Sequence, residues 1–184
     1  MGSRLEQARE WARVRHALQR YGAQPYRCHL DHVERIATPF GEQARIVAQL
    51  HDILEDTATR VDEIAALFGP TVARAVVLVT DPRRPNREER KRALNQRLIV
   101  LDITDEAAWL ALVVKTCDRL ANVIASSEHS PIRFEQYQRE HGGFRVAVYR
   151  PGLCDNLWQE LDGLIDAGQQ ADRHPDHQLH ASIS

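Results

Sequence analysis

Apolar residues recur at spacings of three and four along almost the whole chain, which is the pattern of amphipathic helices. The segment 3–20 shows it first, through Leu5, Ala8, Trp11, Ala12, Val14 and Leu18. The same spacing predicts helices over 3–20, 28–37, 41–54, 60–68, 71–79, 86–101, 104–126, 131–140 and 152–168. Because the chain has no sustained alternating pattern, repeat or heptad array, we predict an all-α fold.

Glycine and proline residues separate the predicted helices. Gly22 and Pro25 mark the first break, and Pro70 suits the first turn of the helix that follows Gly69. The run 76–79 is rich in β-branched residues, so a strand is the alternative there. We expect one domain over 1–168 and a disordered polar tail over 169–184.

Composition narrows the function classes. The 184 residues include 24 basic and 26 acidic side chains, a balance that argues against a protein that coats nucleic acid. No apolar run approaches the roughly 20 residues of a membrane span, and the first residues do not resemble a signal peptide. Three cysteines do not make a disulfide framework, so we expect a cytoplasmic protein. We also expect a monomer or small homo-oligomer, with no nucleic-acid or membrane partner.

Four titratable side chains gather at the end of the predicted helix 41–54. They are His51, Asp52, Glu55 and Asp56. On a continuous helix His51 faces Glu55, and Asp52 faces Asp56. The preceding turns are apolar, and acidic groups at a helix C-terminus oppose its dipole, so something else is expected to stabilise them.

Two further residues suggest a metal site. His29 lies on the preceding predicted helix, and Asp118 lies inside an apolar run, where a carboxylate needs a compensating cation. Each residue alone also has an ordinary explanation: His29 could be a hydrogen-bonded histidine, and Asp118 could pair with Arg119 or a nearby arginine. Cys28 and Cys117 directly precede His29 and Asp118, which raises the alternative of a zinc–thiolate site. Consecutive helical residues point about 100° apart, however, so a cysteine and the ligand next to it cannot both face one ion. We therefore expect both to be buried structural cysteines.

Taken together, the order His, His-Asp, Asp resembles the metal-binding pattern of the HD phosphohydrolase superfamily. The finer spacing resembles the hydrolase domain of the RelA/SpoT family. The motifs that carry this resemblance are Pro25-Tyr26-x-x-His29, His51-Asp52-x-x-Glu55-Asp56-Thr57-x-Thr59, Val79-Thr80-Asp81 and Lys115-x-x-Asp118-x-Leu120-x-Asn122. They cover about 25–137, and the chain length resembles that of stand-alone small alarmone hydrolases.

The resemblance implies an all-helical bundle around one divalent ion and hydrolysis of the 3′-pyrophosphate of alarmones such as ppGpp or ppApp. Its implied metal ligands are His29, His51, Asp52 and Asp118. Glu55 and Asp56 would position and deprotonate the attacking water. A mixed nitrogen and oxygen ligand set suits Mn²⁺, with Fe²⁺ or Zn²⁺ as alternatives.

Contacts to a phosphorylated purine nucleotide are predicted for six residues. They are Arg20, Arg87, Lys91, Asn122, Arg133 and Tyr137. For Arg90 and Lys91 the alternative is a solvated helix face paired with Glu88 and Glu89. The segment 19–24 is shorter and less basic than the family's purine-holding loop, which leaves guanine and adenine open, and the segment 98–108 is a second departure from the family pattern.

Two other functions remain open. One is another HD-type nucleotide phosphohydrolase, a nucleotidase or a phosphodiesterase; many such branches lack the Glu55-Asp56 pair at this spacing. The other is a catalytically silent module that binds a nucleotide or a protein, and it would be expected to have lost a ligand or that pair.

Overall fold

The computed structural model describes residues 2–173, the last five of them only as helical backbone. The elements are α1 (Arg4–His16), β1 (Arg20–Tyr21), β2 (Gln24–Pro25), α2 (Arg27–Ile36), the 3₁₀ helix η1 (Thr38–Phe40), α3 (Glu42–Leu50), α4 (Ile53–Asp56), α5 (Val61–Phe68), α6 (Pro70–Val79), α7 (Arg87–Leu98), α8 (Glu106–His129), α9 (Pro131–Val148) and α10 (Asp155–Arg173). The predicted all-α class is confirmed, and the region 76–79 is helical.

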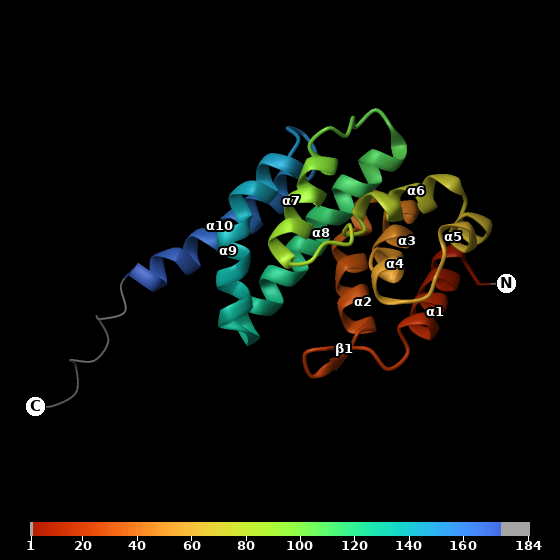
Figure 1. The fold of residues 1–184 in the computed structure, drawn as a ribbon, viewed down its shortest axis with the longest axis horizontal. Helices are drawn as coiled ribbons and strands as arrows, with labels where there is room; N and C mark the ends of the chain where they lie inside the picture. The colour runs from red at the N-terminus through yellow and green to blue at the C-terminus, as the bar shows by residue number, and fades with distance from the viewer. Residues whose placement is uncertain (1, 174–184) are drawn as a thin grey trace, which may run out of the picture.

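Helix α8 is the central element of the bundle. It contacts α2, α3, α6, α9 and α10, and most of its residues from Ala107 to Val123 are buried. The Asp105 side chain accepts hydrogen bonds from the backbone N–H groups of Ala107 and Ala108 and so caps the helix N-terminus. In Figure 1, α1 to α6 lie on one side of α8, and α9 and α10 lie on the other.

The predicted helix 41–54 is interrupted at the titratable cluster. Helix α3 ends at Leu50, and α4 starts at Ile53. Asp52, at φ −100° and ψ 0°, lies outside regular helical geometry. The expectation that His51 faces Glu55 along one helix is therefore wrong, because the break turns the side chains on its two sides in different directions.

The first predicted helix, 3–20, is also shorter than expected. Helix α1 ends at His16, and Ala17 has a positive φ of 31°. The chain then forms a short antiparallel hairpin, which the sequence pattern did not predict, with Tyr21 opposite Gln24. Gly22, at φ 57°, occupies the left-handed conformation that this tight turn requires.

The last two long helices extend further than the sequence pattern predicts. Helix α9 continues to Val148, beyond the expected end at 140, and α10 continues to Arg173. The predicted tail 169–184 therefore begins inside α10, and 174–184 lies outside the described residues. In the segment 98–108, the Arg150 guanidinium donates to the backbone oxygens of Leu98, Ile99 and Leu101.

A buried carboxylate joins the first three long helices. Glu34 on α2 accepts two hydrogen bonds from Arg9, with N···O distances of 2.7 and 2.8 Å. It also accepts hydrogen bonds from Arg45 and Gln49 on α3. Although burial opposes the effect, these hydrogen bonds lower the pKa of Glu34. Within the described residues, no helix combines the length and the apolar character that crossing a membrane requires.

Candidate metal centre and phosphate-binding cavity

Three predicted ligands meet at the centre of the bundle. His29 from α2, His51 from the α3–α4 break and Asp118 from α8 each place one donor atom within 4.8 Å of the others. The Asp118 Oδ1 atom lies 3.3 Å from His29 Nε2 and 3.5 Å from His51 Nε2. Both histidines are buried, so three elements far apart in the sequence form one group that can hold a metal ion.

The fourth predicted ligand, Asp52, lies beside this group. Its Oδ2 atom is 3.0 Å from His51 Nε2 and 3.9 Å from His29 Nε2. The hydroxyl of Tyr26 donates a hydrogen bond to the same oxygen. At the break between α3 and α4, both His51 and Asp52 therefore lie near His29.

His51 provides a test of whether this group suits a cation. Its Nδ1 lies 2.7 Å from the carbonyl oxygen of Ala48, to which it donates a hydrogen bond. The buried Nε2 has no hydrogen-bond partner, yet it faces the carboxylates of Asp52 and Asp118. A neutral imidazole would then place a lone pair against two negatively charged groups. A cation at this point removes that repulsion, so the donor set fits a divalent metal.

The electrostatics of the same group agree with this fit. Burial opposes a charged imidazole, but the neighbouring carboxylates of Asp52 and Asp118 raise the pKa of His51 well above its ordinary value. Burial likewise opposes ionisation of Asp118, yet the Lys115 ammonium and the two histidines hold its pKa well below the usual range. The centre therefore attracts positive charge, whether a proton or a metal ion supplies it.

Helix α8 supplies two more polar groups beside Asp118. Lys115 is buried, and its Nζ lies 3.1 Å from Asp118 Oδ2. Asn122 donates from Nδ2 to the Asp118 backbone oxygen at 3.0 Å and to its Oδ1 at 2.5 Å. The suggested Asp118–Arg119 pair is wrong, because Lys115 takes that place and Arg119 pairs with Glu140. The sequence motif contained Lys115, but its spacing from Asp118 was not read as an ion pair.

Glu55 and Asp56 leave α4 in different directions. Glu55 Oε1 accepts a hydrogen bond from the backbone N–H of Asp81 at 2.5 Å. Asp56 Oδ2 accepts one from Gln19 Nε2 at 2.7 Å. Part of the Glu55 side chain is exposed, but its carboxyl group is largely shielded from water, and this raises its pKa to about 7. The positive charge of Lys115 opposes the rise in pKa, and the negative charge of Asp52 adds to it. A pKa near 7 suits Glu55 to exchange a proton near neutral pH.

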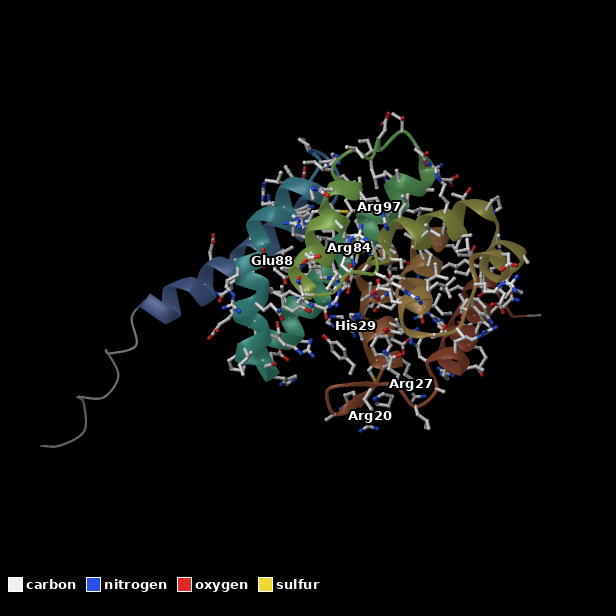
Figure 2. All side chains as sticks on the ribbon, viewed as in Figure 1. Arg20, Arg27, His29, Arg84, Glu88 and Arg97 are labelled. Carbon is white, nitrogen blue, oxygen red and sulfur yellow. The ribbon has the colours of Figure 1, made fainter. Side chains whose placement is uncertain are left out.

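The hairpin places Tyr21, rather than Arg20, at the centre. The Tyr21 ring stacks on His29 with 4.6 Å between ring centroids, and its hydroxyl donates to Asn122 Oδ1 at 2.9 Å. Arg20 is exposed and donates to the carbonyl oxygen of Ala23. Figure 2 shows Arg20 at the hairpin near the edge of the molecule and His29 closer to its middle.

A cavity of about 60 Å³ lies beside Asp118 and Asn122, and three of the other residues predicted to contact substrate also line it. They are Arg87, Lys91 and Tyr137. Lys91 Nζ lies 2.8 Å from Asp81 Oδ2, and Arg90 is 3.9 Å from the same oxygen. The alternative pairing of these two cations with Glu88 and Glu89 is not observed.

Arg133 and Tyr137 on α9 lie on this side of the centre. Arg133 is exposed, and its positive charge acts on both Tyr21 and Tyr137. The guanidinium groups of Arg87 and Arg119 face the Tyr137 ring, with 5.7 and 4.8 Å to its centroid. Sequence reasoning missed Arg119 as a lining residue, and its partner Glu140 is 21 residues away, too far for a motif to reveal.

The cysteines take no part in the group. Cys117 is buried as expected, whereas the expectation that Cys28 is buried is wrong, because it lies on the exposed side of α2. His29, the next residue, points about 100° away from it and is buried. The ligand group found among the described residues therefore consists of histidine and carboxylate donors.

Comparisons with known proteins support the resemblance that the motifs suggested. The chain is 26% identical over 155 residues to the guanosine-3′,5′-bis(diphosphate) 3′-pyrophosphohydrolase MESH1 of Drosophila melanogaster, covering 80% of this chain and 81% of that protein. It is 35% identical over 103 residues to MESH1 of Danio rerio, covering 54% of each. No family model matches the chain.

A solved structure supports the fold. It represents a metazoan ortholog of SpoT, described as hydrolysing ppGpp and playing a role in starvation responses, and it aligns with a TM-score of 0.77. The two chains are 24% identical, and the alignment covers 91% of this chain and 96% of the other. The predicted resemblance and the predicted helical fold are both confirmed.

Proposed function

From the homology of this chain to the MESH1 pyrophosphohydrolases, we propose that it is a metal-dependent hydrolase of purine alarmone nucleotides. Its reaction would convert ppGpp or ppApp to a nucleoside diphosphate and pyrophosphate. The observation that carries the proposal is the convergence of His29, His51 and Asp118, with donor atoms within 4.8 Å, next to a cavity lined by cations.

His29, His51, Asp52 and Asp118 are the proposed ligands of one divalent ion, for which we favour Mn²⁺ over Fe²⁺ or Zn²⁺. When bound, such an ion lowers the pKa of water and stabilises negative charge on phosphate oxygens. Tyr26 fixes the orientation of Asp52 through its hydroxyl, and the Ala48 carbonyl fixes the ring of His51. These contacts prepare the donor atoms before the ion binds.

Glu55 is the proposed proton acceptor. A water oxygen attacks the phosphorus atom joined to the ribose 3′-oxygen, and Glu55 takes the proton that this water releases. The bond between phosphorus and the 3′-oxygen breaks. The 3′-oxygen departs and takes up the proton that Glu55 returns, and the released pyrophosphate keeps the oxygen of the water. Asp56, held by Gln19, lies next to Glu55 in the chain and helps to position the water. A pKa of about 7 lets Glu55 both accept and return a proton at neutral pH.

The cavity beside Asp118 is the proposed phosphate pocket. Arg87, Lys91, Asn122 and Tyr137 line it and supply donors for phosphate oxygens. Arg20, Tyr21 and Arg133 lie toward the hairpin and α9, where the nucleoside would lie. The flat ring of Tyr21, already stacked on His29, offers a surface for a sugar or a base.

The test is hydrolysis by the protein loaded with Mn²⁺, Fe²⁺ or Zn²⁺. The substrates are ppGpp, ppApp, NADPH and nucleoside monophosphates, with pyrophosphate and phosphate measured separately. We expect pyrophosphate from an alarmone, and loss of this activity in Glu55→Gln with the metal content unchanged. Glu10→Gln, which removes an exposed carboxylate on α1, is the matched control and should behave as wild type.

Each other outcome points to a different function. Phosphate release from NADPH or a monophosphate, without pyrophosphate from an alarmone, would identify another nucleotide phosphohydrolase. No product from any substrate would favour a silent binding module. A cytoplasmic location and a monomeric or small homo-oligomeric state stay predictions that fractionation and light scattering can test.

A further inference from the structure

A second and larger hollow lies on the outer side of the proposed phosphate pocket. It is a groove of about 720 Å³ between α7 and α9, with Arg119 of α8 at its base. Glu88, which lines it, lies where α7 and α9 run side by side in Figure 2. Small-molecule sites commonly have volumes of about 300 to 1,000 Å³, so the groove has the size of a nucleotide site.

The two ends of the groove differ in chemistry. Arg87, Lys91 and Arg119 line the end nearest the proposed phosphate pocket. Ile99 and Val146 line the groove too, although they are not part of the small pocket, and they are 47% and 70% exposed. Glu88 and Glu140 line the groove as well, so the cations outnumber the carboxylates near its first end. A groove with an excess of cations at one end and exposed aliphatic side chains at the other fits a ligand with a phosphate group and an apolar body.

Arg119 is more deeply buried than Arg87 and Lys91, the other two cations at this end of the groove. Its side chain is 8% exposed, and its nearest carboxylate oxygen, Glu140 Oε2, is 3.5 Å away. Arg87 already holds Glu140 more closely, with N···O distances of 2.7 and 3.1 Å. Two guanidinium groups thus share one carboxylate. The Arg119 guanidinium also lies over the rings of Tyr137 and Phe144, 4.8 and 4.2 Å from their centroids, and among the described residues no carboxylate oxygen lies closer to it than that of Glu140.

Adjacent glycines on α9 offer a sharp way to probe the groove. Gly143 lines it, and a Cβ atom there would lie 3.6 Å from Asn95 Nδ2, an ordinary contact. Gly142 is not among the lining residues, and a Cβ there would meet no atom within 4 Å. Glycine inside a helix costs about 1 kcal/mol relative to alanine. Side chains at these two positions therefore change the helix similarly but fill different space.

We propose that the groove between α7 and α9 is a second binding site, for an organic phosphate of nucleotide size. Its phosphates bind Arg87 and Arg119, and its apolar body lies against Ile99 and Val146. Both arginines also line the small pocket, so an occupant of the groove draws their charge away from substrate phosphates. This last consequence, and only this one, rests on the proposed function; by linkage, each ligand then weakens the other.

The first experiment is calorimetric titration of the metal-free protein with GTP and with tripolyphosphate, which needs no turnover. We expect GTP to bind more tightly than tripolyphosphate, because only GTP has a body for the apolar end. Gly143→Leu fills the groove and should weaken GTP binding by about tenfold or more. Gly142→Leu is the matched control and should bind as wild type.

A second variant distinguishes loss of the binding site from misfolding. Arg92→Glu reverses a charge on an exposed lining residue of α7 and should weaken GTP binding while leaving the melting temperature unchanged. Asn122 lines the small pocket but not the groove, so Asn122→Ala should leave GTP binding in place. The proposal fails if wild type does not bind GTP, if the two glycine variants bind it equally, or if Asn122→Ala alone abolishes binding.

Discussion

Replacing Lys115 by methionine should expose the charge imbalance of the metal centre. Lys115 is one of only two lysines in the chain, and it is buried against Asp118 with 3.1 Å between Nζ and Oδ2. Methionine has a similar length and no charge. The substitution therefore keeps most of the packing but leaves Asp52 and Asp118 without the ammonium group.

The expected loss follows from the burial of both partners. The Lys115 and Asp118 side chains are 7% and 13% exposed, so solvent screens the lost interaction little. Removing one partner of a buried ion pair costs about 3–5 kcal/mol. For a chain of this length each kcal/mol lowers the melting temperature by about 2–4 °C, which predicts a fall of about 6–20 °C in the metal-free protein.

The assay is thermal unfolding in EDTA and again with Mn²⁺. A bound cation restores positive charge beside Asp118, so Mn²⁺ should raise the melting temperature more in Lys115→Met than in wild type. Lys91→Met is the control: its partner is Asp81, its side chain is 22% exposed, and its loss should be smaller. Lys115 also lowers the pKa of Glu55, so the pH profile of hydrolysis should move to higher pH in Lys115→Met.

Two results would refute this reasoning. A fall of less than about 1 kcal/mol in EDTA would mean that Asp118 is compensated without Lys115. An equal response of both proteins to Mn²⁺ would mean that the ammonium group and the metal ion do not act on the same carboxylates.

Three further predictions concern single side chains. The kcat/KM for alarmone hydrolysis should fall about tenfold per pH unit below pH 7, because Glu55, with a pKa of about 7, gains a proton there. Above pH 7 it should level off. A profile that is flat between pH 5 and 8 would exclude Glu55 as the base. Glu34→Gln should lower the free energy of unfolding, measured in urea at pH 7, by about 3 kcal/mol at most. The loss is smaller to the extent that solvent screens the partly exposed arginine partners. Because the folded pKa of Glu34 is lowered, its contribution to stability is complete above the unfolded pKa of about 4.5 and is lost as the pH falls through the folded pKa. The stabilities of variant and wild type should therefore converge in acid. A difference that stays constant with pH would contradict this. Tyr21→Phe should lose about 1 kcal/mol of stability with the hydrogen bond to Asn122, and KM should rise while metal content stays constant; unchanged unfolding would show that this bond contributes nothing.

Local patterns predicted much of the fold and named the residues that form the candidate metal centre. Spacing of apolar residues located the long helices because each buries one face against its neighbours. The motifs named His29, His51, Asp52 and Asp118, and these side chains do come together. Asp118 was recognisable because a carboxylate inside an apolar run needs a cation.

Features that depend on distant contacts were not predictable in this way. The break at Asp52 lies in a segment whose residues suit a helix, and tertiary contacts to His29 and Tyr26 accompany it. The hairpin has strands of only two residues, too short for an alternating pattern. Glu140 carries no local signal, because its partners Arg87 and Arg119 lie 53 and 21 residues away.

Helix α8 has a consequence for how such a molecule can be redesigned. Lys115, Asp118 and Asn122 stand on one buried helix, so their separations are fixed by its rise of about 1.5 Å per residue and cannot be adjusted one at a time. Arg133 lies on an exposed part of α9, whereas the hairpin carries Tyr21, whose ring and hydroxyl contact His29 and Asn122. Under the proposed function, the nucleoside end can be redesigned at Arg133 with little effect on packing, whereas a replacement hairpin must retain an aromatic ring against His29.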